Sequence, residues 1–271
     1  MAHKALIGGT AYEISGGKTL VNGTAYSIDK GKTLVGGAAY EVGFEVKHVS
    51  SDGEVLDSWA DISAGLYMDF YSIRNWKSFS LSDGTNIIME IAAFNADTKT
   101  DGTTASITWI SKHVITKRGM NSTATHDGGW EGSELRTWLQ SNFYATMPAE
   151  VRNVVLPVKK TYVYKTSNSS AARFECIDAL WIPSAGEVNA AASSANQGAY
   201  EGVGAIYDIY FADNASRKKT ESGSTTGLYW WLRTIYSASL TKTFRVVVST
   251  GGLGGFSNAD NNRGVVLGFC T

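Results

Sequence analysis

The first 44 residues contain three copies of a short repeat in which apolar runs alternate with turn signals. The copies read LIGGTAYEISGGKT, LVNGTAYSIDKGKT and LVGGAAYEV, so that leucine, glycine and tyrosine recur every 14 residues. The turn signals are Gly8-Gly9, Asn22-Gly23 and Gly36-Gly37, with a second set at Gly16-Gly17 and Lys30-Gly31. Such dipeptides between short β-prone runs are strong hairpin signals. The pattern therefore predicts short all-β hairpin repeats over residues 1–44.

A unit of 14 residues is too small to bury its own apolar face, so it must stack on its neighbours or on other chains. This property suits an anchoring or oligomerisation element. The alternative is a three-copy β-meander that packs against the main domain. Neither interpretation assigns any chemistry to the repeats.

Residues 45–85 have no clear period, and we expect a connecting segment there. Within it, LDSWADISAGLY predicts a short helix capped by Asp57 or Ser58. From residue 86 onward the pattern is clearer, and we expect one domain over residues 86–271. Its predicted strands cover residues 86–94, 106–115, 155–166, 228–234, 244–250 and 263–269.

Helical spacing follows in the middle of this domain. Residues 128–144 carry apolar side chains at Leu135, Leu139 and Phe143, which predicts an amphipathic helix with Ser133 near its start. Proline begins a second short helix over residues 147–155. Residues 177–188 are expected to form a strand and then a helix, because Ser184 and Glu187 have capping-box spacing. Two or three helices with a late antiparallel sheet make an α+β arrangement.

Composition excludes several classes of protein. Hydrophobic residues make up 43% of the 271 residues, and 8 Trp, 13 Tyr and 10 Phe can build a core, which excludes a disordered chain. The net charge of −1 argues against nucleic-acid binding, and no apolar run approaches the roughly 20 residues that insertion into a membrane requires. Serine and threonine outnumber charged residues, so hydroxyls cover much of the surface.

Five motifs in order carry a resemblance to a known family. They are FNADTKTDGTTASITWISKHVITKRGM (94–120), GGWEGSELRTW, DALWIPSAGEV, YWWLRT and the terminal NNRGVVLGFC. Together they resemble a domain of uncharacterised function that is common in phages and prophages of Gram-positive gut bacteria. That domain is similar to C-type lectins, formylglycine-generating enzymes and the variable proteins of diversity-generating retroelements. The repeats also resemble those of phage structural proteins that bear this domain.

The resemblance implies a C-type-lectin-like domain over residues 86–271 in a phage virion protein of the tail fibre or tail tip. It implies assembly in the bacterial host cytoplasm, contacts with other virion proteins through residues 1–44, and a homo-oligomer, with a trimer favoured. The sequence departs from the family at Thr234 and Ile235, where Ser-Pro is expected, and lacks a cysteine in FRVVV. A family disulfide to Cys270 is therefore not implied, and pairing of Cys176 with Cys270 stays open.

The residues suggest binding rather than catalysis. Cys176 and Cys270 lie in apolar strands, where a thiol is usually inert, and no nucleophile elbow or phosphate loop occurs. The Glu-Pro-Asn and Trp-Asn-Asp loops of calcium-dependent lectins are absent. We therefore expect no enzyme activity, cofactor or metal. Asp97 and Asp101 remain calcium candidates because they are oxygen ligands in one loop, although a solvated turn explains them as well.

The strongest functional signal lies in the C-terminal loops. Trp230 and Trp231 alternate on one strand, so we expect one in the core and the other beneath a loop platform. Tyrosine, serine, asparagine and glycine with occasional arginine are typical of adaptable recognition surfaces. The candidate ligand-binding residues are Arg233, Tyr236, Ser237, Ser239, Thr241, Phe256, Ser257, Asn258, Asp260, Asn261, Asn262 and Arg263. Arg233 shares a face with Trp231, so a structural ion pair or hydrogen bond is an alternative role for it. For the loops, the alternative is that they are solvent-exposed connections without a ligand.

The resulting hypothesis is a non-enzymatic virion protein that binds a host-surface protein or glycan. One alternative is a purely structural virion protein, such as a head decoration, head fibre or tail scaffold. Another is an enzyme that acts on surface polysaccharide, which would require a pair of carboxylates in a cleft.

Overall fold

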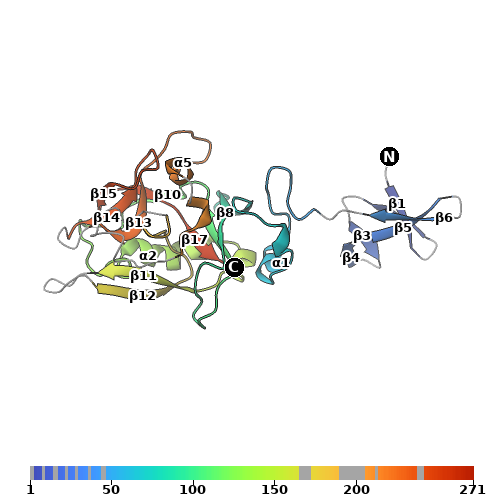
Figure 1. Ribbon diagram of the computed structural model, residues 1–271, viewed down its shortest axis with the longest axis horizontal. Coiled ribbons are helices and arrows are strands. Elements are labelled where there is room, and N and C mark those ends of the chain that lie inside the picture. Colours follow the sequence, from blue (N-terminus) through green and yellow to red (C-terminus); the bar gives the residue numbers. More distant parts are fainter. Residues whose placement is uncertain are drawn as a thin grey trace.

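The computed structural model describes the strands of the repeat region between residues 3 and 43 and, with side chains, residues 47–164, 172–188, 205–210, 213–236 and 241–271 (Figure 1). Over these residues the protein is α+β, with mostly antiparallel sheets and short helices. None of the helices in these ranges is long and apolar enough to cross a membrane.

The repeat region forms three antiparallel hairpins. Their last paired residues, such as Ile7 with Thr10 and Val21 with Thr24, leave two residues for each turn, as predicted. The turn residues themselves lie outside the described residues. Lys30 and Gly31, expected to form a turn, instead begin β5 and pair with Gly43 and Val42. The strands are β1 (His3–Ile7), β2 (Thr10–Ile14), β3 (Lys18–Val21), β4 (Thr24–Ser27), β5 (Lys30–Val35) and β6 (Ala38–Gly43).

Two larger sheets and a hairpin form the body of the protein. One sheet has the order β17-β9-β8-β7, the other the order β10-β16-β13-β14-β15, and β11 pairs with β12. The four-stranded sheet contains β7 (Trp76–Ser80), β8 (Asn86–Phe94), β9 (Ile107–Ser111) and β17 (Gly268–Cys270). The five-stranded sheet contains β10 (Thr116–Arg118), β13 (Trp230–Ile235), β14 (Thr243–Val247), β15 (Gly255–Asn258) and β16 (Arg263–Val265). The hairpin consists of β11 (Val158–Tyr164) and β12 (Ala172–Asp178).

The strand predicted over residues 263–269 is divided between these two sheets. β16 pairs with β10 and, in parallel, with β13, whereas β17 pairs with β9. Val266 and Leu267 connect the two strands, and each is fully buried in a different hydrophobic core. The continuous apolar run thus reflects a segment that is buried while it crosses from one sheet to the other.

The helices are short and are started by side-chain caps. Ser133 accepts a hydrogen bond from the Arg136 amide, and Ser58 accepts one from Asp61, so both serines are the caps that the sequence indicated. Asp57, the other candidate cap, bonds to His48 and Tyr71 instead. The α-helices are α1 (Trp59–Ser63), α2 (Glu134–Trp138), α3 (Tyr144–Thr146), α4 (Ala149–Arg152) and α5 (Asn214–Arg217). Other helical turns are η1 (Met68–Phe70), η2 (Leu139–Phe143) and η3 (Asp208–Tyr210).

The helix expected after Ser184 is absent from residues 183–188, which form a turn. The capping-box bonds are nevertheless present: the Ser184 amide donates to Glu187 Oε2 at 2.9 Å, and the Glu187 amide donates to Ser184 Oγ at 3.1 Å. Among the described residues after 86 there are four α-helices rather than the expected two or three, because α5 lies outside the segment that showed clear helical spacing; α1 corresponds to the short helix predicted in residues 45–85.

Residues 47–85 do more than connect the repeats to the body. β7 is an outer strand of the four-stranded sheet, and Trp59 and Phe79 pack with Phe269 in the core. Trp230 and Trp231 are both fully buried, one in each of the two hydrophobic cores. The expectation that only one of them lies in the core is therefore wrong.

Candidate recognition surface

The edge strand β15 of the five-stranded sheet and the loops beside it present most of the candidate residues to solvent. β15 lies at one edge of this sheet, next to β14. The exposed candidates are Thr241, Phe256, Asn258, Asp260, Asn261 and Asn262, while Tyr236 and Arg263 are half-buried. Ser257 and Arg233 are buried, and Ser237 and Ser239 lie outside the described residues.

An aromatic pair marks the edge of this surface. Phe256 is 51% exposed and stacks on Tyr236 with 4.3 Å between the ring centroids. Arg245 pairs with Phe256 across β14 and β15, and its guanidinium lies 6.0 Å from the centre of the Tyr236 ring. A stack of this kind is a rigid contact surface with few rotatable bonds, which is useful for binding.

Ser257 points to the opposite side of β15 and organises the following loop. Its Oγ accepts hydrogen bonds from Asn261 Nδ2 and Arg263 Nε, both at 3.0 Å. The second bond helps to hold the Arg263 guanidinium 5.4 Å from the centre of the Tyr229 ring. Ser257 therefore positions other residues rather than facing a ligand, because its side chain is buried.

Tyr229 and Arg263 belong to an open cleft of about 400 Å³. Tyr229 is 43% exposed, although it precedes two fully buried tryptophans. The cleft joins the end of β10, the start of β13 and the start of β16. Its lining residues are Lys117, Gly227, Leu228, Tyr229, Ser249, Asn262, Arg263 and Gly264.

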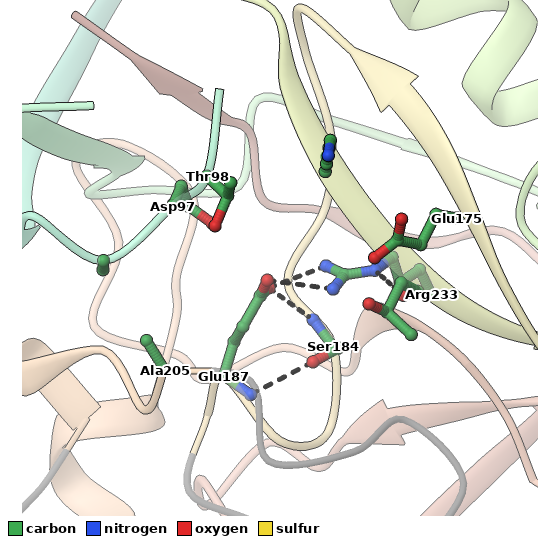
Figure 2. Close-up of a pocket in the computed structure, with 10 residues that line it drawn as sticks. Asp97, Thr98, Glu175, Ser184, Glu187, Ala205 and Arg233 are labelled. Carbon is green, nitrogen blue, oxygen red and sulfur yellow. Dashed lines mark hydrogen bonds and ion pairs between the residues drawn. The ribbon is translucent and has the colours of Figure 1, made fainter. Parts of the chain in front are cut away.

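Arg233 lies elsewhere, beside a second cavity (Figure 2). Its terminal nitrogens donate to both oxygens of Glu187, at 2.7 and 2.9 Å, and Nε donates to the Thr161 carbonyl at 2.9 Å. The side chain of Arg233 is only 3% exposed. Arg233 therefore does not share a surface with the C-terminal loops, because the strand turns this side chain into the interior, where it forms a structural ion pair.

Asp97 joins the same buried network through Lys160. The Lys160 ammonium bonds to Asp97, to Glu187 at 3.1 Å and to the Tyr207 hydroxyl at 2.7 Å, and it is 1% exposed. Two carboxylates and two cations thus balance one another, as buried charges require. We call Asp97, Lys160, Glu187 and Arg233 the buried charge network.

The two calcium candidates, Asp97 and Asp101, do not lie in one site. Asp97 is engaged by Lys160, whereas Asp101 is exposed and its carboxylate accepts hydrogen bonds from the amide and hydroxyl of Thr103, as in a solvated turn. The Thr103 hydroxyl and amide lower the pKa of Asp101. Within the described ranges, no group of three or more His, Cys, Asp or Glu residues could hold a metal ion.

The cavity beside the buried charge network has a volume of about 400 Å³ and is lined by Asp97, Glu175 and Glu187, among other residues. A polysaccharide-cleaving enzyme would need carboxylates of this kind in a cleft. However, a general acid needs a raised pKa. Burial would raise the pKa of Glu187, but the Arg233 guanidinium and the Lys160 ammonium outweigh it and hold this pKa well below its ordinary value. Glu187 is therefore unsuited to donate a proton.

The two cysteines are free and buried. Burial, with Asp178 nearby, raises the pKa of the Cys176 thiol to about 12. Burial also raises the pKa of Cys270 well above its ordinary value, with a contribution from Asp97. Both thiols are therefore protonated at neutral pH, which makes them poor nucleophiles.

Sequence reasoning missed Tyr229, Lys117 and Lys160. Lys160 had a detectable signal, because it alternates with Val158 and Tyr162 on the buried face of β11, where a lysine requires partners. Tyr229 and Lys117 had none, because they meet in one cleft only after β10 and β13 take their places on either side of β16.

A family model described as a domain of unknown function (DUF6273) matches residues 105–270. No curated protein and no solved structure matches the chain.

Proposed function

We propose that this chain, which belongs to the DUF6273 family, is a non-enzymatic phage virion protein that binds a protein or glycan on the host surface. In this proposal the body of the protein is a C-type-lectin-like domain, carried at the tail fibre or tail tip. Two features support the lectin-like assignment: the antiparallel strands near the C-terminus and the order of the five motifs along the chain.

One observation carries the proposal. Phe256 and Tyr236 form an aromatic stack at the free edge of a sheet, where Phe256 keeps 51% of its surface exposed. Asn258, also exposed, follows Phe256 by two residues on the same strand, and the exposed Thr241 lies just before β14. Exposed aromatic anchors with short hydrogen-bonding neighbours are the composition of binding surfaces.

The repeats supply the second part of the proposal. Three similar hairpins precede the body, and each is too small to form an independent core. In our proposal they associate with the same repeats of other copies, giving a homotrimer, and with other virion proteins. Several weak binding surfaces on one particle then act together, which raises the overall affinity without new contacts.

The body also offers a matched control for the aromatic stack. Phe174 in β12 is 40% exposed and stacks on Tyr162, with 5.7 Å between the ring centroids. Phe174→Ala therefore removes the same side chain from a similar exposed stack at another place. The comparison of Phe256→Ala with Phe174→Ala separates a binding role from a general effect of losing an exposed phenylalanine.

The experiment measures binding of the full chain, labelled at its N-terminus, to the bacterial strain that propagates the phage encoding it. We expect Phe256→Ala to weaken cell binding at least about tenfold, as for a central aromatic anchor. Phe174→Ala should change it less than about twofold. Equal effects of the two variants would contradict the site, and no binding of the wild-type chain would favour the structural alternative.

A further inference from the structure

We propose that the open cleft at Tyr229 and Arg263 binds a sugar residue that carries a negatively charged substituent, either a carboxylate or a phosphate. This inference rests on the proposed function, since it names the chemical class of ligand that the recognition surface would take. It is argued from the shape, charge and aromatic lining of the cleft.

The first argument is the state of the Arg263 side chain. Its Nε donates to Ser257 Oγ, and this bond fixes the direction of the guanidinium. The two terminal nitrogens take no part in the bond and can donate to a ligand. Among the residues that the structure describes, Arg263 forms no ion pair with a carboxylate. A planar guanidinium that is held in place and turned toward a cleft can bind a carboxylate or phosphate through two parallel hydrogen bonds.

The second argument is the local balance of charge. Lys117 lines the same cleft and forms an ion pair with Glu221 at 2.7 Å, in which both side chains are about half exposed. Lys218 also approaches, because its Cε lies 2.9 Å from the position that a Cβ on Gly227 would occupy. Two cations, Lys117 and Arg263, thus line the cleft and Lys218 approaches its wall at Gly227, while none of the described lining residues is a carboxylate. The local positive charge favours an anion.

The third argument is the aromatic wall. Tyr229 exposes 43% of its surface beside Arg263 and provides an apolar face next to the cation. A sugar ring has apolar C–H faces and a polar rim, so it can lie against the tyrosine while its charged group meets the arginine. Asn262 and Ser249 add short hydrogen-bonding groups on the cleft wall, as a hydroxyl-bearing ligand requires.

The backbone that forms the cleft is closely packed at two glycines. A Cβ on Gly264 would lie 2.7 Å from Val114 Cγ2, and one on Gly227 would lie 1.9 Å from the Ser249 carbonyl oxygen. Glycine at both positions lets three chain segments approach closely, which builds the depression beside Tyr229. The shape of the cleft is thus fixed by backbone packing, and its charge is supplied by side chains from separate strands.

The test uses the full chain and four probes: glucuronic acid, glucose 6-phosphate, glucose and inorganic phosphate, each titrated by NMR. We expect the two charged sugars to bind with a Kd of about 1 mM, as is typical of small polar ligands. Glucose should bind at least about tenfold more weakly, because it lacks the charge. Inorganic phosphate should bind more weakly than glucose 6-phosphate, because it cannot contact Tyr229.

The variants assign the binding to this cleft. Arg263→Gln should weaken the binding of both charged sugars at least about tenfold. Tyr229→Ala should lower the affinity for glucose 6-phosphate to the level of the affinity for inorganic phosphate. Arg152→Gln, in α4, makes the same change of charge at a half-buried arginine outside the cleft and should have no effect. Lys117→Gln provides a further variant at a side chain that is 45% exposed, in case Arg263→Gln affects folding.

Three results would overturn the proposal: no binding of either charged sugar, equal binding of glucose and glucuronic acid, or equal binding of phosphate and glucose 6-phosphate. The relative affinity of the two charged sugars identifies the favoured substituent. If the cleft binds neither sugar but Phe256→Ala abolishes cell binding, the proposed function stands without this ligand. If the cleft binds charged sugars but the chain binds no cells, the ligand class stands and receptor binding fails.

Discussion

Arg233 and Arg263 lie on neighbouring strands of one sheet, and both were expected to bind a ligand. Arg233 is 3% exposed, and its terminal nitrogens bond to both oxygens of Glu187. Arg263 is half-buried, bonded through Nε alone to a serine, and faces an open cleft. An arginine in the sequence thus indicates a polar interaction. Whether that interaction stabilises the fold or binds a ligand depends on the groups that surround the guanidinium.

The largest expected effect comes from breaking the buried charge network. Glu187→Gln removes one of the two carboxylates of the buried charge network, while Lys160 and Arg233 keep their positive charges. We expect the free energy of unfolding to fall by about 3–5 kcal/mol, as when one partner of a buried pair is removed. Urea denaturation followed by tryptophan fluorescence measures this, because all 8 tryptophans lie between residues 59 and 231.

The matching change at the cleft should leave stability almost unaltered. Arg263→Gln is expected to change the free energy of unfolding by less than about 1 kcal/mol, because no buried charge loses its partner. A loss of several kcal/mol at Arg263, or of less than about 1 kcal/mol at Glu187, would contradict the division between a folding role and a binding role.

A third buried cation, Lys219, tests whether an ion pair or burial decides how tightly a lysine side chain holds its proton. Lys219 is 3% exposed and its Nζ lies 3.7 Å from Glu90 Oε2, so its pairing is weaker than that of Lys160. Burial lowers the pKa of Lys219 to about 8, although Glu90 opposes the shift. The folded protein therefore binds this proton less tightly than the unfolded chain, and between pH 8 and the ordinary lysine pKa of about 10.4 its stability should increase with pH.

The comparison with Lys219→Met isolates this contribution, because other titrating groups are shared. From pH 8 to pH 9 the wild type should gain about 1 kcal/mol of unfolding free energy relative to Lys219→Met. Urea denaturation at the two pH values measures the difference. If the difference in unfolding free energy between the wild type and Lys219→Met stays the same at both pH values, Glu90 compensates for the burial of Lys219.

The smallest expected effect concerns the residue that holds Arg263. Ser257→Ala removes the acceptor of the Arg263 Nε bond, and we expect the affinity for glucuronic acid to fall about two- to fivefold, because one hydrogen bond that orients the guanidinium is lost. In the Arg263→Gln background the same change should have no further effect on affinity, because the two residues act as a unit. Additive losses would show that Ser257 acts independently of Arg263.

Local structure was largely predictable from the sequence. The strand over residues 86–94 has the predicted bounds, and Ser133 and Ser58 cap the helices that follow them. The three hairpins follow from dipeptides between apolar runs. These features depend on residues that are close in the chain, so alternation, caps and turn residues carry enough information.

The candidate site was only partly predictable. The sequence identified Phe256, Asn258 and Asn262 as candidates that are indeed exposed, but Phe256 and Asn258 lie in strand β15 rather than in the expected loop, and the interior Arg233 was placed among them. It did not reveal Tyr229. Exposure of an aromatic or arginine residue depends on which strands become its neighbours, and that information does not lie in the adjacent residues.

By itself, then, the sequence determined the hairpin repeats, the helix caps, most of the strands and the polar character of the C-terminal loops, because each depends on short-range backbone preferences. The tertiary structure alone decided that residues 263–269 divide between two sheets, that Arg233 meets Glu187, and that Lys117, Tyr229 and Arg263 share a cleft. Each of these depends on pairing between segments far apart in the chain, where burial and charge balance select the partners.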